Sequence, residues 1–380
     1  MKLLIHHHTE AYIDDSGIWV QSFIGAWASE IANNTELVGL LLHTTLLKNE
    51  KLDYCISSSN VKLESLGENR GWRNRIQRLR FIKKKCKSLS NYSHLIVRGV
   101  TPRQLLVMNS SPIKNKFFLF VGCLNDAADH KIIGIKSLIQ HAIMKYRNLE
   151  LKKISTLSSF ASNSPTTSKE LKTKLNIESI YIPTNTISIR DFSLNVLKVK
   201  LESFRILFVG RVTQDKGIEE LIRAFQKIKQ RHTEKNFILD VVGPYSSHYI
   251  DEMRNKYPQD FEKISFHGFI NFGDALLDFY DKSDVYVLPS YHEGFPHTIW
   301  EAASRQLPII CTCVGGIPGL IDNSLVTFIE KKNVDSIVNA LHRVLVSPEN
   351  IDNKVEKIWR IAKNNTVEIS AKNLVNWLSS

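Results

Sequence analysis

The chain has 380 residues, of which 43% are hydrophobic and 23% are charged, a balance typical of soluble globular proteins. This length is too great for one small core and fits two domains. No run of about 18 apolar residues occurs, which excludes a membrane-spanning helix, and the apolar start is too short for a signal peptide. The five cysteines form no Cys-x-x-Cys pair, which argues against a disulfide framework or a zinc site and indicates a reducing cytoplasmic setting.

The positive charge of the chain is confined to its first half. Residues 1–200 hold 29 Lys and Arg against 15 Asp and Glu, whereas residues 201–380 hold 21 against 23. A surplus of this kind attracts negative partners. We therefore expect a membrane surface, a lipid diphosphate or a nucleic acid to approach the first half.

The chain is expected to begin with a strand over residues 2–8 and a glycine loop that contains Ser16 and Gly17. A helix follows, with Ile24, Trp27 and Ile31 at helical spacing. Strand, glycine loop and helix in this order can hold a phosphate or a sugar, although a single glycine can also mark a plain turn. Strands are expected next at about 36–45 and 54–59.

Residues 70–87 are the most basic stretch, with nine Lys and Arg and no acid. Trp72, Ile76 and Leu79 fall on one helical face, so the segment predicts a basic amphipathic helix. Such a helix can lie on an anionic bilayer. It can equally be an ordinary helix that packs its apolar side on its own sheet, and the two interpretations are compatible. The residues expected to face a membrane are Arg73, Arg80, Lys83 and Lys84.

Strands near 93–99 and 116–122 continue the first predicted sheet. A polar loop with Asp126 and His130 follows, and these residues can cap a helix over about 131–149. Strands near 151–160 and 179–183 complete this half, and residues 186–203 are expected to be the linker.

The second half opens with an apolar strand over 205–210 and a loop that carries Arg211 and Lys216. The helix after it has apolar residues at helical spacing from Ile218 onward. Strand, glycine, cationic loop and helix N-terminus together form a typical anion site, and two cations across one turn can embrace a diphosphate. The plainer alternative is a pair of surface cations. Strands at 236–242 and 264–270 follow, the first of which ends at Gly243.

Residues 285–320 form the most informative stretch. A strand over 285–288 leads to a loop with Glu293, then a helix with Glu301, a strand over 308–314 and the turn Gly315-Gly316. In parallel α/β sheets, ligands bind beyond the carboxyl ends of the strands, where Glu293 and this turn lie. The spacing of the two glutamates suits two hydroxyl-bearing groups of one long ligand. The alternative is two unrelated surface acids.

This pattern is similar to the retaining glycosyltransferases of family 4, which have the GT-B fold. Their signature of two glutamates separated by seven residues is present from Glu293 to Glu301. An alanine-rich turn, an apolar strand and Gly-Gly-Ile-Pro, here Gly315 to Pro318, then follow. The family usually has an acid after this last motif, where this chain has Gly319.

The resemblance implies an α/β architecture with two Rossmann-like parallel-sheet domains that face a central cleft. Residues 1–198 would form the acceptor-binding domain and residues 199–354 the donor-binding domain. The tail over 355–380 would pack back on the first domain.

The resemblance also implies roles for residues. Arg211 and Lys216 would hold the leaving diphosphate, Glu293 the sugar hydroxyls and Glu301 the ribose. The other donor-binding candidates are Gly243, Phe269, Ile270, Gly294, Phe295, Pro296 and Thr298. Ser16 and Gly17 would line the acceptor side of the cleft, and Asp126 or His130 would face the transferred sugar.

The activity implied is metal-independent transfer of a sugar, with retention, from a nucleotide-diphosphate sugar without any cofactor. UDP or GDP is the expected nucleotide. The acceptor would be a glycan or a polyprenyl-diphosphate-linked glycan in bacterial surface polysaccharide or lipopolysaccharide synthesis. The enzyme would be cytoplasmic and peripheral on an anionic membrane, with no nucleic-acid partner. The alternatives are a GT-B nucleotide-sugar epimerase and a non-catalytic basic protein that binds membrane or nucleic acid.

Overall fold

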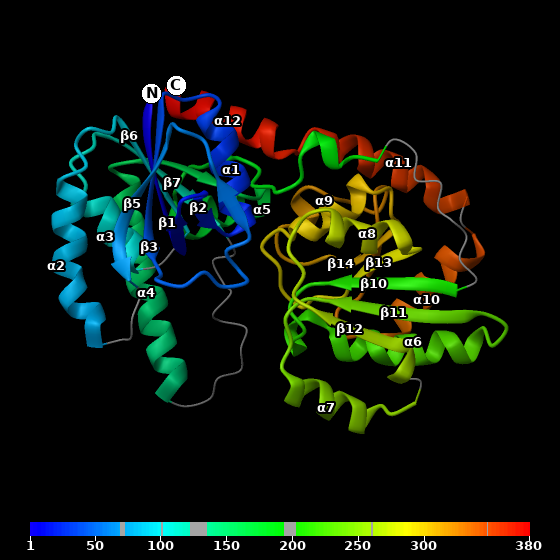
Figure 1. Ribbon diagram of the computed structural model, residues 1–380. Coiled ribbons are helices and arrows are strands. Elements are labelled where there is room, and N and C mark those ends of the chain that lie inside the picture. The colour runs from blue at the N-terminus through cyan, green and yellow to red at the C-terminus, as the bar shows by residue number, and fades with distance from the viewer. Residues whose placement is uncertain (69–72, 100–101, 122–134, 194–202, 260, 348) are drawn as a thin grey trace. The chain divides into compact units, whose positions relative to one another are not determined.

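The computed structural model describes residues 1–380 except 69–72, 100–101, 122–134, 194–202, 260 and 348. For the helical residues 73–78, 102–103, 135–140 and 349–350 it describes the backbone alone. The described chain forms two compact units (Figure 1). Unit 1 comprises Met1–Thr186 and Val367–Ser380, and unit 2 comprises Ile187–Thr366.

Unit 1 is built on a parallel sheet in the order β5-β3-β1-β6-β7-β8-β9. Sequential strands run outward from β1 in both directions, which makes the sheet doubly wound, with its topological switch point between β1 and β6. The strands are β1 (Lys2–Asp14), β3 (Leu37–Thr44), β5 (Val61–Glu68), β6 (His94–Arg98), β7 (Asn115–Phe120), β8 (Ser159–Ser162) and β9 (Ile180–Tyr181).

A β-hairpin replaces the glycine loop that we expected after the first strand. β1 continues to Asp14 and turns back into β2 (Gly17–Val20), which pairs antiparallel with β1 and with β4 (Tyr54–Ile56). The predicted strand and the predicted helix, α1, are both present, but the glycine loop that should join them directly was predicted wrongly. The reason is local, because Asp14 accepts hydrogen bonds from the amide of Ser16 and the indole of Trp19, which close a tight turn.

Helices cover both faces of the first sheet, and the core consists of two clusters, one on each side. Trp27 of α1 and Leu374 of α12 belong to one cluster, so the C-terminal helix packs against α1 in unit 1. The helices of this unit are α1 (Ser22–Ala32), α2 (Arg73–Lys87), α3 (Pro102–Ser110), α4 (Ile135–Ser155), α5 (Pro165–Glu170) and α12 (Val367–Ser379).

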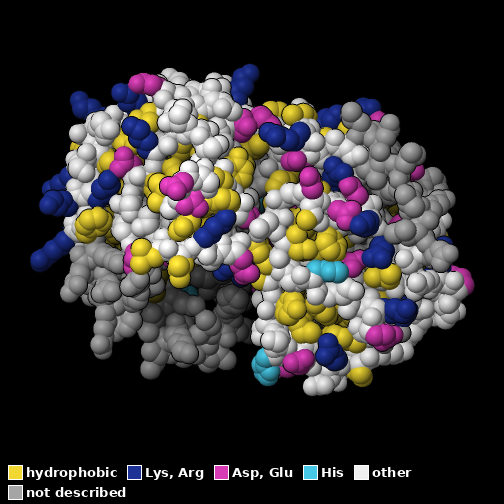
Figure 2. Space-filling model, in the orientation of Figure 1, with side chains coloured by type: hydrophobic (Ala, Val, Ile, Leu, Met, Phe, Trp, Pro, Cys, Tyr) yellow, Lys and Arg dark blue, Asp and Glu magenta, His cyan; other side chains and the backbone are white. Residues whose placement is uncertain are grey.

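The described part of the basic stretch, Arg73–Lys87, forms helix α2, as the sequence predicts. Ile82 and Cys86 are buried against the sheet, and Lys85 forms an ion pair with Glu64 of β5 at 2.7 Å. Leu79 and Phe81 are exposed. Lys and Arg side chains gather at the edge of unit 1 where α2 lies (Figure 2), and the described ones include Arg80, Lys83 and Lys84. The helix thus both packs inward and presents a basic face.

Unit 2 contains a parallel sheet in the order β12-β11-β10-β13-β14-β15. This order places the switch point between β10 and β13. The strands are β10 (Ser203–Val209), β11 (Asn236–Val242), β12 (Ile264–Gly268), β13 (Val285–Leu288), β14 (Ile309–Thr312) and β15 (Thr327–Ile329). The helices are α6 (Ile218–Arg231), α7 (Ser247–Lys256), α8 (Asp274–Lys282), α9 (His297–Ser304), α10 (Val334–Val346) and α11 (Glu349–Lys363).

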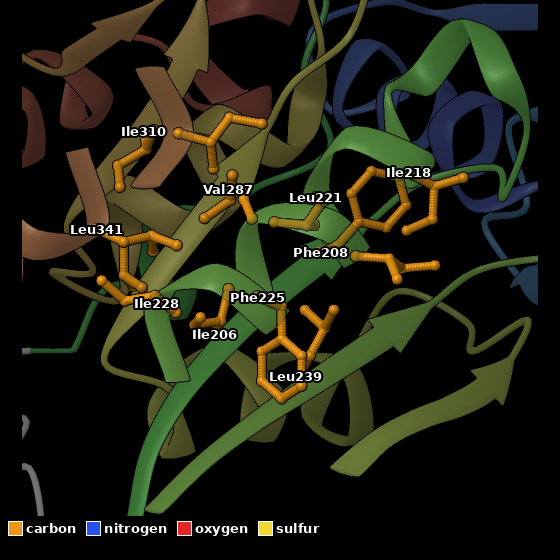
Figure 3. Packing of buried hydrophobic residues seen from close by; sticks show 14 of the residues in the cluster. Ile206, Phe208, Ile218, Leu221, Phe225, Ile228, Leu239, Val287, Ile310 and Leu341 are labelled. Atoms are coloured by element: carbon orange, nitrogen blue, oxygen red, sulfur yellow. The ribbon is translucent and has the colours of Figure 1, made fainter. Parts of the chain in front are cut away.

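Helix α6 shows how the sequence builds the core of unit 2. Its apolar residues recur at helical spacing, and Ile218, Leu221, Phe225 and Ile228 are completely buried. They pack against side chains of β10, β11 and β13, such as Phe208 (Figure 3). A second cluster covers the opposite face of the sheet. This packing fixes the start of α6, and with it the loop after β10.

The boundaries of the units differ from the domain limits expected from the sequence. Residues 187–193 belong to unit 2, and the tail that belongs to unit 1 begins at Val367. Among the described residues, no helix combines the length and the hydrophobicity needed to cross a membrane.

Gly243 offers a direct test of the contact between the ends of β10 and β11. Its φ is 138°, and a Cβ there would lie 1.9 Å from the backbone oxygen of Gly210. We expect Gly243→Ala to lower the free energy of unfolding by about 2–4 kcal/mol, because neither backbone can yield without moving a strand.

Gly268→Ala is the matched control, since its φ is 72° but no atom lies within 4 Å of the added Cβ. In this variant, backbone strain should lower the free energy of unfolding by only about 1–2 kcal/mol. Urea unfolding of both variants checks the comparison, and equal losses would contradict the proposed clash.

Candidate functional site

Three loops meet at the carboxyl edge of the second sheet, beside its switch point. The loop after β10 reaches Gly217, where a Cβ would lie 2.2 Å from the carbonyl oxygen of Pro289, just after β13. The turn after β14 contains Gly315, where a Cβ would lie 1.6 Å from the carbonyl oxygen of Glu293. Both glycines have positive φ values, 70° and 59°. Glycine is therefore required at both positions for the loops to approach so closely.

Lys216 and Glu293 meet across two of these loops. Lys216 Nζ lies 2.7 Å from Glu293 Oε1, and the two side chains are 13% and 10% exposed. Removing two charges from water costs several kcal/mol unless they pair well, so the geometry of each loop depends on the other. The two residues are 77 positions apart in the sequence, which predicted a ligand contact for each of them but not the ion pair between them.

Arg211 lies in the same loop as Lys216 but is much more open. Its side chain is 66% exposed, and its guanidinium makes a long contact of 3.9 Å with Asp215. The pKa of Asp215 is lowered: partial burial acts to raise it, but the hydroxyl of Thr213 and the charges of Lys216 and Arg211 outweigh that effect. Arg211 is consequently available to an anion, whereas Lys216 is held in place.

Glu301 is a deeply buried acid of the site. It lies in α9, is 5% exposed, and accepts a hydrogen bond of 2.8 Å from the hydroxyl of Tyr280 in α8. Burial raises the pKa of Glu301 to about 7, the Tyr280 hydrogen bond acts in the opposite direction, and Asp191 adds to the increase. This carboxyl can therefore change its protonation state near neutral pH.

Several of the predicted donor residues lie in or just before the first turn of α9. Thr298 accepts a hydrogen bond of 2.6 Å from the buried hydroxyl of Tyr286. Phe295 stacks on Trp300 in the core, which leaves its backbone, and not its ring, to a ligand. No side chain caps the helix at Pro296 within the described structure, so amides of the first turn can serve an anion.

The remaining predicted donor residues lie at the ends of β11 and β12. The amide of Gly243 donates to the carbonyl of Gly268 at 2.7 Å, which joins the two ends. Phe269 follows directly and is 42% exposed, whereas Ile270 is partly buried against the core. An aromatic ring that is exposed beside backbone groups in this way can contact the planar base of a nucleotide.

A polar cluster beside these strands was not predicted from the sequence. Asp240 is buried and bonds Arg205 and His267, each at 2.8 Å. The tyrosines that orient Glu301 and Thr298 were also missed. Tyr286 lies in an apolar strand and Tyr280 on the buried face of a helix, so no local signal distinguished them from core residues.

The sequence also predicted site residues in unit 1. Gly17 and Ser16 lie at the hairpin, and the amide of Ser22 at the start of α1 is taken by Asp53 Oδ1 at 2.8 Å. An anion therefore finds that helix start already occupied by a carboxylate. Asp126 and His130 lie outside the described residues, as does the side chain of Arg73.

Taken together, unit 2 presents two cations, amides of a helix start and two acids along one sheet edge. This set can bind a nucleotide diphosphate that carries hydroxyl-rich groups on both ends. Among the described residues, no group of three or more His, Cys, Asp or Glu side chains is placed to hold a metal ion.

Comparison with known proteins agrees with this chemistry. Residues 190–364 match the family model of glycosyl transferases group 1. An uncharacterized glycosyltransferase of Methanocaldococcus jannaschii is 38% identical over 148 residues, which cover 37% of this chain and 35% of that protein. The UDP-Gal:alpha-D-GlcNAc-diphosphoundecaprenol alpha-1,3-galactosyltransferase of Escherichia coli is 28% identical over 180 residues, 46% of each chain.

The fold extends over the whole chain. HepE of Anabaena, solved in complex with UDP and glucose, matches with a TM-score of 0.74 over 100% of both chains at 13% identity. The chain thus has the GT-B fold that the sequence predicts, with two Rossmann-like units. The matched segments span only 35–59% of the length of the first curated relatives.

The raised pKa of Glu301 predicts a pH-dependent stability. The folded chain holds this proton up to a pH of about 7, whereas the ordinary value is 4.5. Between these values the folded state binds more protons than the unfolded state, so the free energy of unfolding falls as the pH rises. We expect a loss of roughly 2–3 kcal/mol from pH 4.5 to 8.

Urea unfolding across this pH range measures the effect, with Glu301→Gln as the reference. Because the amide does not titrate, the difference between wild type and Glu301→Gln should shrink or reverse with rising pH. Parallel curves for the two proteins would show that Glu301 does not titrate in this range.

Proposed function

We propose that this chain, a group 1 glycosyltransferase over residues 190–364, moves a sugar from a nucleotide-diphosphate sugar to a lipid-linked glycan, with retention of configuration. The observation that carries the proposal is the buried pair of Lys216 and Glu293 at the switch point. A cation that can bind the diphosphate and an acid that can bind sugar hydroxyls lie side by side, just as the diphosphate and the sugar are adjacent in such a donor.

The proposed reaction relies on electrostatic stabilisation of the leaving group. Negative charge builds on the diphosphate as the bond to the sugar breaks. Lys216, Arg211 and the amides at the start of α9 would stabilise that charge from fixed positions. Glu293 would orient the sugar hydroxyls and Glu301 the ribose. No bound metal ion is needed for this chemistry.

The proposed acceptor follows from the character of unit 1. The charge surplus of the chain lies in residues 1–200. Helix α2 presents Arg80, Lys83 and Lys84 to solvent beside the exposed Leu79 and Phe81. A basic face with apolar side chains fits an anionic bilayer. A relative that acts on a diphosphoundecaprenol substrate supports an acceptor of this type.

The donor can be identified by thermal stabilisation. A ligand of the folded state raises the melting temperature, and we expect this with sugars linked to UDP or GDP but not with those linked to ADP or CMP. The shift should be lost in Glu301→Ala. A well-folded sample that responds to none of them would refute the proposed donor site.

Lys216→Met should lower kcat by about 10²- to 10³-fold, because the developing charge on the diphosphate loses a preorganised cation. Lys227→Met is the matched control, since Lys227 lies on the outer side of α6 and pairs with Asp335 at 2.8 Å. The assay follows nucleotide release in the presence of EDTA. Equal rates for the two variants, or a complete loss of wild-type activity in EDTA, would contradict the mechanism.

Membrane binding should depend on α2. We expect the protein to co-sediment with vesicles that contain anionic lipid at low salt, and Lys83→Glu with Lys84→Glu to reduce the bound fraction several-fold. The control, Lys152→Glu with Lys153→Glu on α4, changes the charge equally. Equal losses in both variants would show that net charge, and not α2, governs binding.

A further inference from the structure

A pocket of about 580 Å³ lies at the amino edge of the first sheet, opposite to the edge where doubly wound sheets bind their ligands. It opens where β8 and β9 begin, at Ser159 and Ile180, and the end of α4 forms one side of it. Helix α12, which belongs to unit 1, contributes Trp377. The volume falls in the usual range for pockets that bind small organic ligands. No residue of the proposed transfer chemistry lines this pocket.

Trp377 forms a fixed wall of the pocket. It is partly exposed, and the ring of Phe117 of β7 supports it edge to face, with 4.9 Å between the ring centres. Leu374 and Leu378 of the same helix are buried in the core of unit 1, which anchors α12. A tryptophan held in this way offers a large apolar surface with a polar N–H group at one end.

Three serine hydroxyls of the lining donate their protons within the protein. Ser155 and Ser158 donate to carbonyl oxygens of α4 at 2.8 Å and 2.9 Å. Ser179 donates to the hydroxyl of Ser168 at 3.1 Å. A hydroxyl whose proton is used in this way still has lone pairs on its oxygen. These serines therefore offer acceptors to a ligand that brings hydroxyl protons of its own.

Asn176 adds an amide to the wall from a left-handed backbone position. Its φ is 56°, and its backbone amide donates to the carbonyl of Lys172 at 3.0 Å, which ends the helical turn before it. Glycine would adopt this conformation with less strain, whereas asparagine brings a side chain that both donates and accepts hydrogen bonds. The lining therefore combines donors with acceptors.

The charges at the pocket are balanced. Among the described residues that line it, Glu178 alone is charged, and it forms an ion pair with Lys172. The neighbouring Lys174 pairs with Glu170 at 2.9 Å. Nucleic acids and other phosphate-bearing ligands are bound by a surplus of Lys and Arg. This balance therefore favours an uncharged ligand.

An aromatic ring beside hydroxyl and amide groups matches the chemistry of a sugar. A sugar ring has apolar C–H faces and a rim of hydroxyl groups. One face can rest on an indole while the rim exchanges hydrogen bonds with serine and asparagine side chains. Ile180 also lines the pocket and is 45% exposed, so it extends the apolar part of the wall.

We propose that this pocket binds an uncharged segment of a glycan, at a site separate from the site of sugar transfer. The inference goes beyond the proposed function, because the pocket holds the glycan and takes no part in the reaction. It rests on that function only for the choice of ligand. A second contact of this kind raises the affinity for a long glycan when both sites can be reached at once.

Calorimetric titration with three uncharged hexasaccharides tests the proposal: maltohexaose, laminarihexaose and chitohexaose. At least one of them should bind wild type, and glucose should bind more weakly because it fills less of the pocket. Trp377→Leu should weaken the binding of the hexasaccharide about tenfold or more, since a large apolar contact is lost. The absence of binding by all three, up to their solubility limits, would overturn the proposal.

Trp359→Leu is the matched control for the loss of a tryptophan. Trp359 lies in unit 2, is also partly exposed, and also rests edge to face on a phenylalanine, Phe192. This variant should bind the hexasaccharide as wild type does. Equal weakening by Trp359→Leu and Trp377→Leu would overturn the assignment to this pocket.

Asn176→Gly tests the pocket without a loss of core packing. Its melting temperature should change little, because relief of backbone strain offsets the greater freedom of glycine in the unfolded chain. Loss of the amide should weaken hexasaccharide binding about two- to tenfold. Lys332→Gly, at a φ of 60° in unit 2, should bind as wild type does. Unchanged binding by Asn176→Gly would assign the loss in Trp377→Leu to altered folding and overturn the pocket.

A heparin hexasaccharide distinguishes this pocket from the basic surface of unit 1. Its sulfate groups are attracted to Lys and Arg side chains, such as those of α2, so Trp377→Leu and Asn176→Gly should bind it as wild type does. Weaker binding of heparin by both variants, with no change for the uncharged hexasaccharides, would overturn the assignment to an uncharged glycan.

Failure of this inference can be told apart from failure of the proposed function, because the titration contains no nucleotide. If nucleotide sugars stabilise the protein but the pocket variants bind hexasaccharide as wild type does, the glycan site is wrong and the proposed function stands. If hexasaccharide binding depends on Trp377 and Asn176 but no nucleotide sugar binds, the glycan site stands and the transferase fails.

Discussion

The ion pair between Lys216 and Glu293 depends on how closely the backbone of unit 2 is packed at one sheet edge. The two side chains come from loops after β10 and β13, which are neighbours in the sheet although their residues lie 77 positions apart. Gly217 and Gly315 permit the approach, because a Cβ at either position would overlap a carbonyl oxygen. Without these contacts each charge would be buried alone, at a cost of about 3–5 kcal/mol.

Both units place polar groups where a doubly wound sheet leaves room for a ligand. In unit 2 the switch point holds cations and acids that pair with one another, such as Lys216 with Glu293. In unit 1 the corresponding position holds Arg98, whose Nε and Nη1 have no hydrogen-bond partner among the described residues. The two switch points differ in their chemistry. A site whose charges are paired is stable without a ligand, whereas an unpaired buried cation favours the binding of an anionic ligand.

Much of the architecture could be predicted from the chain itself. Apolar periodicity located α6, and the glycine after β10 located the loop with Lys216. The hairpin at Asp14 was missed because one glycine after a strand is compatible with a helix start or with a return strand. The deciding hydrogen bonds come from Asp14 to residues on both sides of the turn, and no short pattern encodes their geometry.

The sequence by itself determined the glutamate pair, the cationic loop and the glycine turns, because spacing along one chain fixes which residues leave each strand end. The tertiary structure decided which of these groups touch. It joined Lys216 to Glu293, placed Tyr280 against Glu301, and set Arg98 against Phe23. Burial and charge pairing act between elements that are distant in sequence, so their effect on a site appears only once the strands lie side by side.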